Sequence, residues 1–246
     1  MILGIIPARY ASTRFPGKPL ADILGKSMIQ RVYEQAKQSK HLNKIVVATD
    51  DERIFQHVKN FGGEVVMTAD NHPSGTDRCL EALNIIGGNY EYVINIQGDE
   101  PLISADQIDE LAVPLKDGSI EIATQMIKVT DHDLLFSPSE VKIVLNDKME
   151  ALYFSRTPIP YLKGKPASEW HLHHTYYRHA GMYAYRKDIL EKITKLPVSS
   201  LEIAESLEQL RWLENGFKIK CIIAKHESLC VDTPEDIKTI EDRLKN

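Results

Sequence analysis

Short runs of aliphatic and β-branched residues alternate with segments of helical spacing through the first half of the chain. Five of these runs are predicted to be buried strands: Ile2 to Ile6, Lys44 to Thr49, Glu64 to Thr68, Tyr92 to Gln97 and Ile122 to Val129. Their apolar residues are too continuous for a sheet with one solvated face. Such strands separated by helices indicate βαβ units, so the sequence predicts an α/β fold with a mostly parallel, doubly wound sheet.

Helix signals fill the segments between the strands and continue after residue 186. Ser104 with Gln107 forms a capping box, and Thr233, followed by proline and two acidic residues, is typical of a helix start. The remaining predicted elements are helices at about residues 28–36, 187–195 and 201–215, the last ended by Gly216, and a strand at 218–225.

The pattern changes between about residues 131 and 186. There the strand-like VKIVL and ALYFS are followed by the prolines of TPIP and by a polar stretch that precedes GMYAYR. We expect a smaller lobe inserted at 131–186 within a single α/β domain that spans residues 1–246. A chain of 246 residues, 43% of them hydrophobic, suffices for one such domain and would be short for two.

The net charge and the cysteine pattern limit the classes of binding partner and indicate the cellular compartment. Thirty Lys and Arg against thirty-five Asp and Glu give a net charge of −5, which opposes a general affinity for nucleic acid or anionic lipid. Cys79, Cys221 and Cys230 form no CxxC pair and suit a reducing compartment. There is no signal-peptide pattern, and no apolar run approaches the roughly 20 residues of a membrane span, so we expect a cytoplasmic protein.

The loop after the first strand, PARYASTRFPGKP, is the strongest candidate for an anion site. Arg9, Arg14 and Lys18 alternate there with small residues and prolines, at the sheet edge where parallel sheets bind ligands. A Walker A motif is excluded because Leu20 stands where its first glycine would be, and the GxGxxG of dinucleotide-binding proteins is absent. The loop from Pro7 to Lys18 is therefore predicted to hold a nucleoside triphosphate by another design.

A second motif, HPSGTDR, follows the third strand at the same edge. Its Ser74, Gly75 and Thr76 offer hydroxyls and accessible backbone just ahead of a helix that carries Arg78. Because a helix N-terminus favours anions and polar groups, this turn is predicted to contact the same ligand.

Acidic residues at the same edge suggest a metal. QGDEP places Gln97 and Asp99 at the end of the fourth strand, and Asp232 follows the last one. Magnesium usually takes one or two protein carboxylates and completes its shell with phosphate oxygens and water. We therefore expect Asp99 and Asp232 to hold Mg²⁺ on the triphosphate.

The histidines of HLHH, between His171 and His174, suggest zinc at first sight. They lie in a polar stretch without cysteine or HExxH spacing, so we interpret them as surface residues. His179 opens a strand-like segment and is expected to face a cleft. On a later helix Glu205, Glu208 and Gln209 share one side.

Eight motifs occur in a fixed order, and together they resemble one enzyme family. They are PARYASTRFPGKPL, ATDD, SGTDR, INIQGDEP, ALYFSR, YAYR, LEQLR and VDTPED. This set resembles the 3-deoxy-manno-octulosonate cytidylyltransferases, the CMP-Kdo synthetases of lipopolysaccharide biosynthesis. The resemblance implies a nucleotide-diphosphosugar-transferase-like fold, a homodimer formed through the smaller lobe, and the reaction of CTP with Kdo to give CMP-Kdo and pyrophosphate.

The resemblance also implies a role for each matching residue. The resemblance implies that Arg14, Lys18, Asp99 and Asp232 are the catalytic residues and that the two aspartates are the ligands of Mg²⁺. Nucleotide contacts fall to Pro7, Ala8, Arg9, Ser12, Arg14, Lys18, Ser74, Gly75, Thr76, Arg78 and Gln97. Sugar contacts fall to Gln97, Arg156, His179, Tyr183, Tyr185, Glu208 and Gln209.

Three alternatives stay open at the level of sequence. The nearest is a cytidylyltransferase for a related acid, 8-amino-Kdo or a sialic acid. A glycosyltransferase also uses an acidic metal site on such a sheet, but it consumes a sugar nucleotide and releases no pyrophosphate. The third is a nucleotide-sensing module without catalysis. No residue stands out as a general base.

Overall fold

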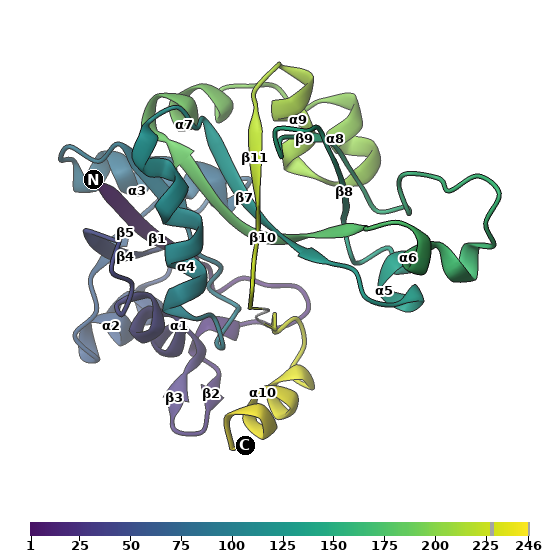
Figure 1. Ribbon diagram of the computed structural model, residues 1–246. Coiled ribbons are helices and arrows are strands. Elements are labelled where there is room, and N and C mark those ends of the chain that lie inside the picture. The colour runs from purple at the N-terminus through teal and green to yellow at the C-terminus, as the bar shows by residue number, and fades with distance from the viewer. Residues whose placement is uncertain (227–228, 246) are drawn as a thin grey trace. The chain divides into compact units, whose positions relative to one another are not determined.

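The computed structural model describes residues 1–226 and 229–245, and these form two compact units (Figure 1). One unit comprises Met1–Lys116 with His226–Asn246, and the other comprises Asp117–Lys225. The second unit thus extends on both sides of the insertion predicted at 131–186. Within the described residues, no helix is both long enough and apolar enough to cross a bilayer.

The first unit is built on four parallel strands. Their order is β6 (Tyr92–Asn95), β1 (Ile2–Ala8), β4 (Lys44–Thr49) and β5 (Val65–Met67). All four were predicted, and their parallel pairing confirms the βαβ interpretation. Because neighbouring parallel strands end at one edge, the loops after β1 and β6 meet there.

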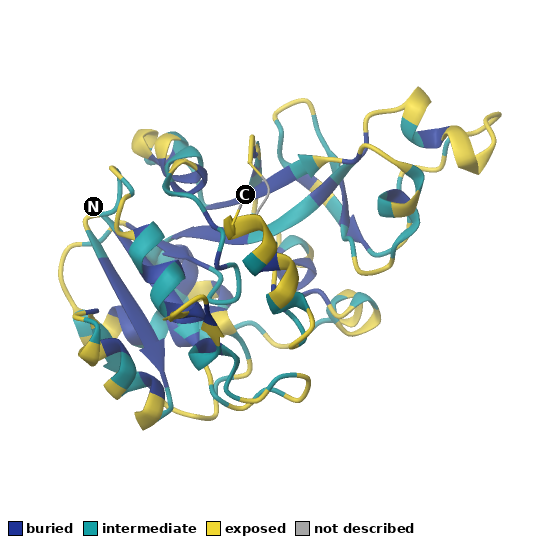
Figure 2. Ribbon diagram, turned by 90° about the horizontal axis from the view of Figure 1, so that it is seen from below, coloured by how far each residue is buried: buried dark blue, intermediate teal, exposed yellow. Residues whose placement is uncertain are grey.

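Helices accompany this sheet and bury its apolar residues. They are α1 (Met28–Ala36), α2 (Glu52–Asn60), α3 (Gly75–Ile86), α4 (Ala105–Ala112) and α10 (Asp236–Lys245), with a short η1 (Lys18–Leu20) and the hairpin β2 (Asp22–Ile23) and β3 (Lys26–Ser27). The predicted apolar face of α1 is buried from Met28 to Ala36, and the Ser104 hydroxyl caps α4 by accepting from the Gln107 N–H. Figure 2 shows the buried strands and the exposed outer turns of the helices.

The second unit is a mixed sheet. Its central β7 (Ile122–Lys128) pairs in parallel with β11 (Ile219–Ile223) and antiparallel with β10 (Tyr177–Arg186), which continues to β8 (Lys142–Leu145) and β9 (Ala151–Ser155). Along the chain, η2 (Val113–Asp117) ends where the second unit begins. The helical elements of the second unit are α5 (His132–Phe136), η3 (Ala167–Glu169), α6 (Trp170–His173), α7 (Lys187–Ile193), α8 (Ser200–Glu205) and α9 (Glu208–Glu214).

Two predicted helix boundaries were wrong. The helix expected at 201–215 is split into α8 and α9 at Ser206, whose φ of 53° is left-handed. The Glu205 carbonyl accepts from Arg156 Nε at 2.7 Å, so side-chain contacts hold the break. The last helix begins at Asp236 rather than after Thr233, because the Asp236 carboxylate accepts the backbone N–H groups of Asp232 and Thr233 and closes the turn before it.

Candidate active site

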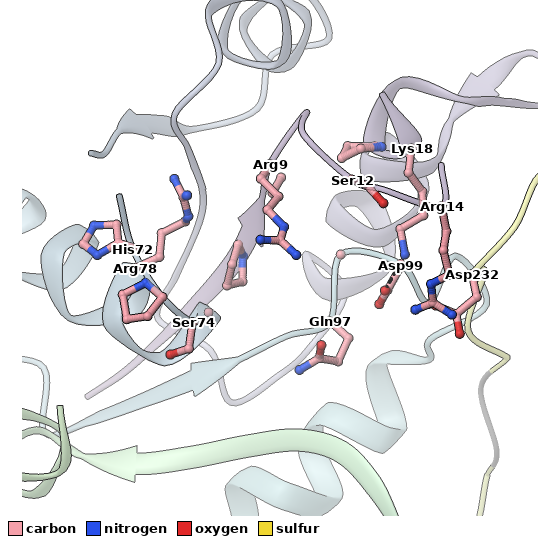
Figure 3. A pocket seen from close by; sticks show the side chains of 16 residues that line it. Arg9, Ser12, Arg14, Lys18, His72, Ser74, Arg78, Gln97, Asp99 and Asp232 are labelled. Carbon is pink, nitrogen blue, oxygen red and sulfur yellow. Dashed lines mark hydrogen bonds and ion pairs between the residues drawn. The ribbon is translucent and has the colours of Figure 1, made fainter. Parts of the chain in front are cut away.

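A cavity of about 310 Å³ opens at the carboxyl edge of the first unit's sheet (Figure 3). It is lined by Pro7, Ala8, Arg9, Ser12, Arg14, Lys18, Pro19, His72, Pro73, Ser74, Gly75, Arg78, Gln97, Gly98, Asp99 and Asp232. Every residue predicted to contact the nucleotide lines this cavity except Thr76, which is buried in the first turn of α3. The two predicted metal ligands line it as well.

The loop after β1 is held in shape by its own backbone and by one stacked side chain. Gly17 donates its N–H to the Tyr10 carbonyl at 2.9 Å and adopts a φ of 73°, a conformation that favours glycine. The Arg53 guanidinium lies 3.2 Å from the centre of the Tyr10 ring and is itself held by Asp51. Arg9, Arg14 and Lys18 are therefore presented from a preorganised loop.

Two cations of this loop pair with the two predicted metal ligands. Lys18 Nζ lies 2.7 Å from Asp99 Oδ2 and also donates to the Val231 carbonyl at 2.8 Å. Arg14 Nη2 lies 2.9 Å from Asp232 Oδ1. The side chains of the Lys18 pair are 17% and 28% exposed, whereas those of the Arg14 pair are 66% and 46% exposed. The Arg14 pair is consequently weak and easily rearranged.

The opposite wall is the N-terminus of α3. The Ser74 hydroxyl caps the helix by accepting from the N–H groups of Thr76 and Asp77. Arg78 is 4% exposed, and its guanidinium donates to Thr68 Oγ1 at 2.6 Å and to Asp50 Oδ2 at 3.0 Å. Arg78 thus fastens the loops that follow β4 and β5, and it shapes the wall beside a helix terminus that favours anions.

Four lining residues were missed from the sequence: Pro19, His72, Pro73 and Gly98. His72 Nε2 hydrogen-bonds to Glu81, and this bond is the main cause of the lowered pKa of the Glu81 carboxyl. A Cβ on Gly98 would lie 2.9 Å from the Pro7 carbonyl oxygen, so only glycine fits this approach of two backbones. Both residues lie inside motifs already singled out, HPSGTDR and QGDEP.

The acidic pair suits a divalent cation. One oxygen from each of Asp99 and Asp232, together with Cys230 Sγ, lie within 4.8 Å of one another. Two carboxylates beside a cavity lined with cations match the donor set that Mg²⁺ takes on a triphosphate. Desolvation of the sulfur, with the charges of Asp99 and Asp232, raises the pKa of the Cys230 thiol, so this surface residue is not a thiolate nucleophile at neutral pH.

No comparable metal cluster forms in the HLHH segment, as far as the chain is described. Asp99, Cys230 and Asp232 are the one group of three or more such side chains there that lies close enough to hold an ion. His173 instead pairs with Glu169 at 3.3 Å on the exposed α6 region. His173 and His174 are exposed, which agrees with the interpretation of this segment as surface residues, whereas His171 is half-buried and its Nδ1 is buried, so His171 does not fit that interpretation.

The predicted sugar contacts other than Gln97 lie in the second unit. Arg156 donates from Nε to the Glu205 carbonyl and from Nη1 to the Pro138 carbonyl at 3.0 Å. Its guanidinium therefore fixes the break between α8 and α9, just ahead of Glu208 and Gln209. Gln209 is 5% exposed, and its buried Nε2 has no hydrogen-bond partner among the described residues.

His179, Tyr183 and Tyr185 form an aromatic cluster on β10. The rings of His179 and Tyr183 are 5.0 Å apart, and both tyrosines make edge contacts with Trp212. The register of β10 shifts between Ala180 and Tyr183, which re-aims this part of the strand. Both tyrosines are buried, with Tyr183 7% and Tyr185 0% exposed, so Tyr183 is slightly more accessible to a ligand.

His179 is neutral at physiological pH. Burial lowers its pKa to about 4, from an ordinary value of 6.5. Thr124 Oγ1 donates to the Met182 carbonyl at 2.9 Å and so accepts from His179 Nε2 at 2.8 Å, which assigns the proton to Nε2. The imidazole can therefore accept a hydrogen bond from a ligand at Nδ1, and it carries no positive charge.

Comparisons with known proteins agree on one family. The sequence model described as "Cytidylyltransferase" matches residues 3–220. A 3-deoxy-manno-octulosonate cytidylyltransferase of Parabacteroides distasonis is 57% identical and covers 96% of this chain and 95% of its own, and one of Bacteroides thetaiotaomicron is 53% identical over 99% and 98%.

Solved structures extend the comparison to the fold. A CMP:2-keto-3-deoxy-manno-octonic acid synthetase complexed with CTP superposes with a TM-score of 0.91 at 41% identity, covering 99% of this chain and 98% of the other. A cytidylyltransferase of Leptospira borgpetersenii shares the fold alone, with a TM-score of 0.65 at 19% identity over 99% and 86%. The likeness to the first structure confirms the predicted nucleotidyltransferase-like α/β fold.

Proposed function

The chain belongs to the 3-deoxy-manno-octulosonate cytidylyltransferase family, and we propose on this premise that it transfers CMP from CTP to the anomeric hydroxyl of Kdo, releasing pyrophosphate for lipopolysaccharide biosynthesis. One observation carries the proposal. A rigid basic loop and two carboxylates from distant segments meet in one cavity at the carboxyl edge of a parallel sheet. This combination suits a triphosphate with its cation better than it suits a sugar nucleotide alone.

The basic loop is assigned to the triphosphate. Arg9, Arg14 and Lys18 supply positive charge, and the α3 N-terminus at Ser74 and Gly75 adds the helix dipole. Charge grows on the phosphoryl oxygens as the sugar hydroxyl attacks the α-phosphorus and pyrophosphate leaves. Preorganised cations stabilise that charge, and this stabilisation does not depend on a general base.

Asp99 and Asp232 are assigned to Mg²⁺. When bound, this ion polarises the α-phosphate and lowers the pKa of the attacking hydroxyl. Two ion pairs support the assignment, since Lys18 and Arg14 neutralise both carboxylates. When CTP binds together with Mg²⁺, the triphosphate can pair with Lys18 and Arg14 while Mg²⁺ pairs with the two carboxylates, so no charge is left unpaired.

The sugar contacts are assigned to the second unit and to Gln97. The neutral His179, the Tyr183 hydroxyl and the buried Nε2 of Gln209 supply hydrogen bonds for the hydroxyls of an acidic sugar. Arg156 acts on this set through the backbone of residues 205 and 206, and Glu208 is anchored by Arg211 at 2.9 Å. The choice of sugar acid depends on these side chains.

We assign the protein to a homodimer in the cytoplasm. Large apolar side chains are exposed on the second unit, among them Leu152, Ile203 and Ile223 at 59%, 69% and 47%, and such side chains suit contact with a second copy of the chain. The described cysteines are all free thiols, as expected in a reducing compartment. Sedimentation of the wild type and of Ile203→Lys tests the dimer, which the lysine should weaken.

The function is tested by pyrophosphate release with CTP, Mg²⁺ and a panel of sugar acids. Kdo should give the highest kcat/KM, and replacing CTP with ATP should abolish turnover because a purine does not fit contacts built for cytosine. Preference for 8-amino-Kdo or a sialic acid would show that the protein is a cytidylyltransferase for that related acid instead. Tight CTP binding without turnover on any acid would instead indicate a nucleotide sensor.

A further inference from the structure

Cys230 lies beside the acidic pair because of how the chain enters its last helix. Val231 is fully buried, packs with Ile23, Met28 and Ile240, and donates its N–H to the Asp99 carbonyl at 2.9 Å. Val231 thus anchors this segment in the core, and Cys230 Sγ and one oxygen from each of Asp99 and Asp232 lie within 4.8 Å of one another.

We propose that Asp99, Cys230 and Asp232 form a three-ligand site for a thiophilic divalent cation such as Zn²⁺ or Cd²⁺, which competes there with Mg²⁺. The inference rests on the proposed function, since it shares both carboxylates with the Mg²⁺ site. Thiolate sulfur selects zinc-like ions, whereas magnesium prefers oxygen ligands only. The thiol therefore changes which metal the same two carboxylates bind most tightly.

The spacing fits one ion once the ligands draw together. In a tetrahedral zinc site, ligand atoms about 2.0–2.3 Å from the ion are about 3.3–3.8 Å apart, so atoms that now lie within 4.8 Å of one another must approach by up to about 1.5 Å. Each neighbouring ion pair uses one oxygen of its carboxylate, Oδ2 of Asp99 and Oδ1 of Asp232, so the other oxygen of each carboxylate takes no part in these two pairs. On binding, the Cys230 S–H bond breaks, its proton passes to the buffer, and a sulfur–metal bond forms without any change of oxidation state.

The test is a titration of the metal-free protein with Cd²⁺, followed by the ultraviolet absorption band of the cadmium–thiolate bond. One equivalent should saturate the band, and Mg²⁺ should weaken Cd²⁺ binding competitively. Cys230→Ser should abolish the band and weaken Cd²⁺ binding by more than about 100-fold, since outer-shell partners of a metal alone contribute 10–100-fold. Cys230→Ala should give the same result if the serine variant misfolds.

Two outcomes would overturn the proposal. A band that persists in a folded Cys230→Ser protein would assign the thiolate to the buried Cys79 or Cys221. Cd²⁺ binding that Mg²⁺ leaves unchanged would place the ion away from Asp99 and Asp232. The band is independent of turnover, so this inference and the proposed CMP transfer can fail separately.

Discussion

The ammonium group of Lys18 lies 2.7 Å from the Asp99 carboxylate, and the two residues are 81 positions apart in the chain. The pair joins the basic loop after β1 to the turn after β6. In this pair, a cation that is predicted to bind phosphate contacts a carboxylate that is predicted to bind the metal. This pair and the Arg14–Asp232 pair bring the four residues assigned to catalysis close together.

Replacing Asp99 with Asn should lower kcat by at least about 100-fold while leaving the fold intact, because it removes a negative ligand from the metal at the developing charge. Pyrophosphate release and thermal unfolding measure the two effects. Asp106→Asn, an equal change of charge at an exposed position on α4, should leave kcat unchanged. Near-normal turnover of Asp99→Asn would remove Asp99 from the metal site.

The two ion pairs should differ in their contribution to stability. A double-mutant cycle of Lys18→Met and Asp99→Asn, measured by urea unfolding, should give a favourable coupling of about 1 kcal/mol, because that pair is sheltered. The same cycle on Arg14→Met and Asp232→Asn should give a coupling near zero, because both side chains are exposed. Equal couplings would show that exposure does not distinguish the pairs.

Two glycines of the cavity should respond differently to alanine. A Cβ on Gly75 would make ordinary contacts of 3.5 Å or more with the protein, so Gly75→Ala should fold normally and raise the KM for CTP by filling space in the cavity. A Cβ on Gly98 would lie 2.9 Å from the Pro7 carbonyl, so Gly98→Ala should also lower the melting temperature. An unchanged KM in Gly75→Ala would show that the nucleotide does not approach this residue.

His179 should make the protein less stable in mild acid. Its folded pKa of about 4 lies below the ordinary 6.5, so from pH 6.5 downward the unfolded chain binds a proton that the folded chain excludes. The contribution of the neutral ring to the free energy of unfolding is fully present above pH 6.5. About 1–3 kcal/mol of it is lost as the pH falls to about 4. Urea unfolding of wild type and His179→Gln across this range should show the difference, and parallel pH profiles would contradict the burial of the ring.

The strands and the cavity could be predicted because local patterns determine them. The continuous apolar runs of β1, β4 and β6 specify buried parallel strands, and parallel strands bring their following loops to one edge. Arg9, Lys18 and Asp99 were therefore expected at the same edge of the sheet, and all three line one cavity there.

Other features depend on contacts between distant segments and left no local signal. The break at Ser206 is held by Arg156, and Gly98 is required by the Pro7 backbone. Met149 adopts a φ of 58° in the β8–β9 turn, where no propensity would place a methionine. The position of Cys230 beside Asp99 likewise follows from the folded chain rather than from either segment alone.

The central claim is that the anomeric hydroxyl of Kdo attacks the α-phosphorus of CTP. The most direct test is a reaction with Kdo that carries heavy oxygen at the anomeric hydroxyl, followed by mass spectrometry and phosphorus NMR of the products. The account predicts that the label is retained as the oxygen bridging sugar and phosphate in CMP-Kdo, with one pyrophosphate released for each molecule formed. Loss of the label from the bridge, or CMP and pyrophosphate without a sugar nucleotide, would contradict it.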